Sequence, residues 1–221
     1  MRQYVDNLLD MPYDVICTHG HPDHAGGNMK FNQVYLSEGE FQLVNYVIQT
    51  KVRHMIMNCV MRKQGLSFST EHFIAQKEMN YHSYKDYDVF NLGGVTIIPT
   101  HLPGQTSGII GFLIPELRTA ILGAACANPT IMNQDSSGTV ESYREGLFNL
   151  NQHRSEFNSV LTPHSNFGEP SLLVDHNLYW TELILLNKDD GFRIRLGGKE
   201  SFVSRNKRFF HQQGYSGNII Y

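Results

Sequence analysis

The chain has 221 residues, of which 41% are hydrophobic and 18% charged, and its formal net charge is −3 at pH 7. This length suffices for one sizeable domain with its own core, and the composition is that of an ordinary globular protein. The slight negative charge gives no reason to expect nucleic acid or an anionic membrane surface as a partner. No apolar run approaches the roughly 20 residues of a membrane span, and we see no charged-then-apolar secretory leader.

The cysteines indicate a reducing environment. Cys17, Cys59 and Cys126 are far apart and show no Cys-x-x-Cys spacing. An odd number of scattered thiols fits a cytoplasmic protein better than a disulfide framework. The chain shows no internal repeat and no low-complexity segment, so we predict a single domain over residues 1–221.

The first third of the chain alternates short helical and strand patterns. Residues 1–10 carry apolar side chains at helical spacing and predict a short helix. The apolar runs 14–17 and 33–36 are typical of buried strands. The helix after the second strand is expected to begin with a capping box, in which Ser37 is the N-cap and Glu40 stands three residues later.

The segment 50–80 is the hardest to assign, because it lacks a clear period. It contains a cluster of apolar side chains rich in methionine: Met55, Ile56, Met57, Val60 and Met61. Methionine adapts to irregular shapes, so such a cluster can line a substrate pocket. More often it belongs to the core or to a subunit contact, and both interpretations stay open at this point.

From residue 88 onward the pattern becomes rich in β-structure. The glycine pair 93–94 separates two apolar runs, 89–92 and 95–100, which predicts a hairpin. Further strands are predicted at 108–114, 119–122, 160–162, 192–196 and 217–220. Helices are predicted over 140–151 and 172–186.

The sequence THGHPDHAGG follows the first predicted strand and brings three imidazoles and one carboxylate within six residues. Histidine, aspartate and water are the usual ligands of a catalytic zinc. A strand would place His19 and His21 on the same face, and Pro22 would end its ladder. Asp23 and His24 would then approach from the following turn. The pattern predicts two adjacent divalent metals, against the alternative of a histidine-rich surface loop.

HGHPDH followed by AGG resembles the HxHxDH signature of the metallo-β-lactamase superfamily, the αββα metallohydrolases. The resemblance continues in three later segments: HLPGQTSG at 101–108 is similar to the PGHT loop, ILGAAC at 121–126 to a strand ending in Gly-Asp, and LTPH at 161–164 to the last motif. It implies a four-layer αββα sandwich. It also implies a set of metal ligands: His19, His21, Asp23, His24 and His164.

Two positions depart from the family pattern. Gln105 stands where the PGHT loop carries a metal-binding histidine, and an amide oxygen is a weaker zinc ligand than imidazole. The best register places Ala124 where the family has the aspartate that bridges the two metals. Cys126, two residues later, is the alternative thiolate ligand, although a buried structural cysteine is the favoured interpretation. Gln105 is therefore a weak candidate, and the site is expected to hold one metal, two weakly, or none.

In the family, β-structure ordinarily precedes the first motif, whereas here the motif begins at His19. The resemblance therefore implies that the first strands of the N-terminal sheet are missing. An uncovered sheet edge or core face favours association, so we expect a homodimer.

The resemblance implies a metal-dependent hydrolase of an ester, thioester, lactone or phosphodiester, with one or two zinc ions or other metals such as iron or manganese. Asp23 would act in catalysis by orienting the nucleophilic water. The substrate is expected to be a small molecule, which the fold does not identify. The alternative is a catalytically inactive relative that keeps the fold as a binding or assembly protein, an interpretation that Gln105 and Ala124 favour.

Overall fold

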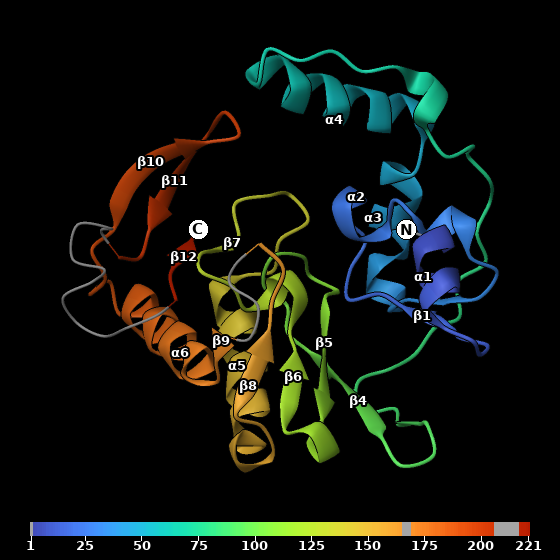
Figure 1. Cartoon of the computed structure of the whole chain (residues 1–221). Helices are drawn as coiled ribbons and strands as arrows, with labels where there is room; N and C mark the ends of the chain where they lie inside the picture. The colour runs from blue at the N-terminus through green and yellow to red at the C-terminus, as the bar shows by residue number, and fades with distance from the viewer. Residues whose placement is uncertain (1, 165–168, 206–216) are drawn as a thin grey trace. The chain divides into compact units, whose positions relative to one another are not determined.

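A computed structural model describes residues 2–164, 169–205 and 217–221 of the chain (Figure 1). The chain separates into two compact units, Met1–Tyr84 and Lys85–Tyr221. Compactness alone does not decide the number of domains, so the single domain over 1–221 stays a prediction. Among the described residues, no helix is long and apolar enough to cross a membrane.

The first unit contains a small parallel sheet surrounded by helices. Strand β1 (Val15–Ile16) pairs with β2 (Val34–Tyr35), and both predicted strands are confirmed in shorter form. The helical elements are α1 (Arg2–Leu8), α2 (Pro22–Ala25), η1 (Asn28–Lys30), η2 (Glu38–Glu40), α3 (Phe41–Val47), α4 (Thr50–Lys63) and η3 (Thr70–His72). The core consists of buried side chains from these elements and from the residues directly after them: Cys17, Ala25, Met29, Phe31, Val34, Leu36, Val44, Val47 and Ile48.

The predicted capping box before α3 is wrong. Ser37 does precede the η2 turn, but its side chain makes no capping hydrogen bond. The Glu40 carboxylate instead accepts a hydrogen bond from the backbone N–H of Gly20, at 2.7 Å. A contact between residues distant in sequence has thus replaced the local one.

Helix α4 occupies much of the segment that the sequence left unassigned. The backbone N–H of Thr50 at its start donates to Gln76 Oε1, at 3.0 Å. Arg53 donates to the carbonyl of Ile74, at 2.8 Å, which ties the helix to the returning chain. Within α4 only Val52 is buried, and Met55 is 57% exposed. The methionine cluster is therefore not part of the core of this unit.

The second unit contains two sheets. The six-stranded sheet has the order β3-β4-β5-β6-β8-β9, and the four-stranded sheet has the order β10-β11-β12-β7. The strands of the first are β3 (Phe90–Asn91), β4 (Thr96–His101), β5 (Ile110–Ile114), β6 (Thr119–Ile121), β8 (Ser159–Leu161) and β9 (Glu169–Pro170). Those of the second are β7 (Thr130–Ile131), β10 (Phe192–Leu196), β11 (Lys199–Val203) and β12 (Ile219–Ile220). The predicted hairpin is confirmed, with Phe90 opposite Ile97.

Two long helices, α5 (Val140–Gln152) and α6 (Leu172–Leu185), pack against each other in this unit (Figure 1). Three 3-10 turns, η4 (Pro115–Leu117), η5 (Gly123–Ala125) and η6 (Arg154–Glu156), connect the elements. Both helices were predicted because their apolar residues recur with the helical period. They bury Tyr143, Leu147, Leu173 and Trp180 against strand residues, and each such large side chain stabilises the fold by about 1.5–3 kcal/mol. The mixed α/β class is confirmed.

Candidate metal centre

Four predicted ligands lie together in the first unit. The ring centroids of His19 and His21 are 4.8 Å apart, and those of His19 and His24 are 4.2 Å apart. Asp23 Oδ2 lies 3.5 Å from His24 Nε2. The His19 and His21 rings are buried, whereas the Asp23 side chain is 56% exposed. The first motif therefore forms a cluster of nitrogen and oxygen donors in which the Asp23 carboxylate is exposed to solvent.

The backbone reaches this cluster through a loop and not through a strand, so the predicted strand placement of the first two histidines is wrong. Strand β1 ends at Ile16, and the last ladder hydrogen bond runs from Cys17 N to Tyr35 O, at 3.0 Å. On the other edge of β2, Tyr35 forms an isolated bridge with His82, whose carbonyl accepts the N–H of Leu36. His21 has an extended backbone and stands just before α2, which begins at Pro22.

The short helix α2 places the second pair of donors. The N–H groups of His24 and Ala25 both donate to the carbonyl of His21, at 3.0 and 2.8 Å. Pro22 suits the first helical position because its missing N–H would have no helical partner there. Asp23 and His24 therefore project from one helical turn beside the loop histidines, where the sequence predicted a turn.

Two further contacts hold the loop, and the sequence pattern predicts neither of them. Thr18 Oγ1 and His19 Nδ1 are hydrogen-bonded, at 2.9 Å. A partner on one ring nitrogen fixes the ring and leaves the other nitrogen as the ligand atom. The Glu40 carboxylate accepts a hydrogen bond from the backbone N–H of Gly20, the residue between His19 and His21. A Cβ at Gly20 would lie 3.0 Å from the backbone nitrogen of Val44, so the loop is pressed against α3.

Gln105 lies in the second unit, in the loop after β4. Ser137 Oγ donates to the Gln105 carbonyl, at 3.0 Å, and Gly138 N donates to the Gly104 carbonyl, at 2.9 Å. The side-chain oxygen of Gln105 is buried and has no hydrogen-bond partner among the described residues. A buried acceptor left unpaired costs about 1–3 kcal/mol. A cation would satisfy this oxygen, so Gln105 fits the role of a weak ligand.

His101, which precedes this loop, has a structural role. Its Nε2 is hydrogen-bonded to the carbonyl of Ser107, at 2.8 Å, and its backbone N–H donates to Asp86 Oδ1, at 2.8 Å. Burial raises the pKa of Asp86, although the hydrogen bond from His101 opposes the shift. His101 therefore closes the loop that carries Gln105.

The positions around Ala124 supply no ligand. Ala124 lies in the η5 turn, is 2% exposed, and belongs to the core of the second unit. Cys126 is fully buried, and its Sγ accepts a hydrogen bond from Asn177 Nδ2, at 3.1 Å. Burial raises the pKa of the Cys126 thiol to about 12, so it stays protonated at neutral pH. Full burial and the hydrogen bond from Asn177 fit the structural interpretation of Cys126.

His164 follows β8, as the sequence predicted for the last motif. Its side chain is exposed, and its backbone has a φ of 65°, in the left-handed region. Residues other than glycine rarely adopt this conformation, and those that do are frequent at functional sites. Whether His164 serves the same metal centre as the first motif stays a prediction.

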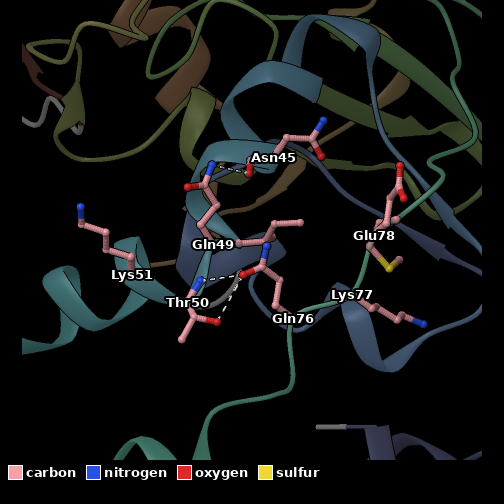
Figure 2. A pocket seen from close by; sticks show the side chains of 9 residues that line it. Asn45, Gln49, Thr50, Lys51, Gln76, Lys77 and Glu78 are labelled. Atoms are coloured by element: carbon pink, nitrogen blue, oxygen red, sulfur yellow. Dashed lines mark hydrogen bonds between the residues drawn. The ribbon is translucent and has the colours of Figure 1, made fainter.

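The first unit also has two surface grooves. One, of about 500 Å³, lies where α3 meets α4, and Figure 2 shows Gln76 pointing into it toward Thr50. The other, of about 860 Å³, runs along α4 past Met55 and Arg62. Neither groove is lined by a histidine of the first motif, and neither gathers a set of metal ligands. The donor cluster is therefore the better candidate for a catalytic site.

Comparisons with known proteins bear on the first motif and on the fold. The model of the metallo-β-lactamase superfamily matches residues 4–36, which include the first motif. No protein of curated function matches the sequence. The solved structure of metallo-β-lactamase IND-7 is 18% identical, with a TM-score of 0.53 over 81% of this chain and 73% of that chain. The metallo-β-lactamase from Pontibacter korlensis is 14% identical, with a TM-score of 0.53 over 81% and 74%.

The DIM-1 metallo-β-lactamase is 12% identical, with a TM-score of 0.54 over 83% of this chain and 75% of that chain. The chain thus has the fold of the metallo-β-lactamases and carries the first motif of their superfamily. At these identities the likeness to the solved structures shows the fold and leaves the reaction open.

Proposed function

We propose that this protein is a metal-dependent hydrolase with a depleted dinuclear site, acting on an ester, thioester, lactone or phosphodiester. The observation that carries the proposal is the clustering of His19, His21 and His24 rings beside the Asp23 carboxylate. Imidazole and carboxylate donors suit zinc, and also iron or manganese. Zinc is the expected cofactor.

Each donor has a defined part in this proposal. His19 and His21 would hold one metal position, with Gln105 as a weak third donor, and Asp23, His24 and His164 would hold the other. A bound divalent metal lowers the pKa of its water toward 7 and so supplies the nucleophile. Asp23 would be the catalytic residue, because its exposed carboxylate could accept a hydrogen bond from the attacking water and orient it.

The alternative proposal is a relative without activity that uses the fold for binding or assembly. Two observations favour it: Ala124 offers no ligand atom, and Gln105 is a weaker donor than histidine. The two proposals differ in metal content, because a binding or assembly role needs no occupied metal position.

The test is metal analysis together with hydrolysis assays. Protein purified without chelator is expected to hold at most one tightly bound zinc per chain and to hydrolyse a generic ester or phosphodiester slowly. Asp23→Asn should lower that rate on the order of 100-fold, the scale of losing one electrostatic stabiliser. His54→Ala is the matched control, because His54 is an exposed histidine on α4 outside the cluster. Failure to bind any zinc even in a titration would contradict the proposal, as would two tightly bound ions.

We also propose a cytoplasmic homodimer. Helix α1 has no buried residue, and its Tyr4 and Leu8 are exposed, as is Met11 beyond it. Exposed apolar side chains close together favour association. All three cysteines are free, which suits a reducing compartment. Light scattering at micromolar concentration should give twice the chain mass, and Tyr4→Ser with Leu8→Ser should shift it toward the monomer. A monodisperse monomer of the unmodified protein is the contrary outcome.

A further inference from the structure

Glu40 is a buried carboxylate directly behind the ligand loop. It is 1% exposed and stands at the junction of η2 and α3. Its Oε2 accepts the backbone N–H of Gly20 at 2.7 Å, and Gly20 is the residue between the two loop histidines. The sequence pattern assigned this side chain to a helix cap, so the contact with the motif is a finding of the structure.

The contact fixes the loop tightly. A Cβ at Gly20 would lie 3.2 Å from both the carbonyl oxygen and Oε2 of Glu40, and 3.0 Å from the nitrogen of Val44. The Gly20 peptide is therefore clamped against the first turn of α3. A hydrogen bond with an ionised acceptor is short and strong, so the orientation of this peptide depends on the Glu40 charge. His19 and His21 flank Gly20 in the chain, so the orientation of this peptide also determines where their imidazole rings point.

The charge of Glu40 also bears on the cluster. A carboxylate removed from water is costly unless positive charge or hydrogen bonds compensate for it. Divalent metal at the adjacent histidines would supply positive charge. In the register predicted from the sequence, Ala124 replaces the bridging carboxylate of the family, so negative charge from Glu40 would help to balance a cation bound at the histidines.

We propose that Glu40 is a positioning residue of the metal centre, which orients His19 and His21 through Gly20 and supplies negative charge behind them. This inference rests on the proposed function, because it requires the cluster to bind a divalent metal. Glu40 touches no substrate in this proposal. It acts on metal affinity by holding the loop in the liganding conformation and by balancing the charge of the bound ion.

Two variants separate the two effects. Glu40→Gln keeps an oxygen that can accept the Gly20 N–H but removes the charge, whereas Glu40→Ala removes both. Glu38→Gln is the matched control, because Glu38 is exposed in the same η2 turn. Zinc affinity is measured by competition with a chromophoric chelator. Glu40→Gln is expected to weaken zinc binding about 10-fold and Glu40→Ala up to about 100-fold, the range typical of residues that support metal ligands. Glu38→Gln should stay within about 2-fold, as expected of an exposed substitution.

A second readout distinguishes positioning from general stability. Hydrogen exchange of the Gly20 amide should be slow in the unmodified protein, slower still with zinc, and at least about 10-fold faster in folded Glu40→Ala. Urea unfolding of the zinc-free proteins reports general stability. Equal zinc affinity of the unmodified protein and Glu40→Gln would overturn the charge part of the inference. Unchanged Gly20 exchange on zinc binding would overturn the positioning part, even if both variants fail to fold. If the unmodified protein binds zinc and either of these results is found, only the inference about Glu40 is overturned. If the unmodified protein binds no zinc, the proposed function itself fails.

Discussion

The double substitution Gln105→His with Ala124→Asp is expected to raise the zinc content from at most one ion per chain to two. The first change exchanges an amide oxygen for imidazole, which binds zinc more strongly. The second restores a carboxylate that offsets the repulsion between two neighbouring dications. Hydrolysis should increase with metal content, on the order of 100-fold, the scale associated with one electrostatic stabiliser.

The surroundings of Ala124 add a second expected result. Its side chain is 2% exposed and lies in the core of the second unit. An aspartate there buries a carboxylate, and an uncompensated buried charge costs several kcal/mol. The zinc-free double variant should therefore unfold at lower temperature than the unmodified protein, and zinc should restore more stability to the variant. Thermal unfolding with and without zinc measures this difference.

The single variants and one neighbouring substitution serve as controls. Gln105→His alone should strengthen zinc binding without adding a second ion. Cys126→Ala removes a buried thiol two residues from Ala124 and adds no donor, so zinc content should not change. If the unmodified protein already binds two ions tightly, or if the double variant gains neither metal nor activity, the register that aligns Ala124 with the bridging aspartate is wrong.

Much of the fold could be predicted because its signals are local. Helices α5 and α6 show the helical period over several turns, and the hairpin of β3 and β4 is marked by Gly93 and Gly94 at its turn. The metal-binding motif could be found for the same reason, since four donors stand within six residues. These features need no knowledge of distant parts of the chain.

The misses share a physical cause, namely contacts between residues far apart in sequence. The start of α4 is capped by Gln76, which stands 26 residues from Thr50, so no local residue marks it. Glu40 fits a capping box by spacing, but its carboxylate accepts a hydrogen bond from the Gly20 N–H instead. The loop histidines were expected on a strand, but β2 provides ladder partners only as far as Tyr35. Alternation of side chains cannot show where a partner strand ends.

The same reasoning identifies Gly138 as a position that the second unit cannot alter without loss of stability. A Cβ there would lie 2.7 Å from the carbonyl carbon of Pro103 and closer still to its oxygen. Both are backbone atoms, so no side-chain rotation relieves the contact. Gly138 N also donates to the carbonyl of Gly104, and Thr139 next to it caps α5. Gly138→Ala is therefore expected to destabilise the second unit by about 3 kcal/mol, at the upper end for overpacking.

Fluorescence of the single tryptophan measures this effect directly, because Trp180 is buried in the core of the second unit. The urea midpoint followed at Trp180 should fall in Gly138→Ala and stay unchanged in Gly27→Ala. Gly27 is the matched control, because a Cβ there meets nothing within 4 Å and its φ of −89° suits any residue. Zinc affinity of folded Gly138→Ala should change less than about 3-fold, since imidazole and carboxylate donors bind zinc more strongly than the Gln105 amide. A loss of zinc binding as large as that of Asp23→Asn would instead make the Gln105 loop a principal part of the metal centre.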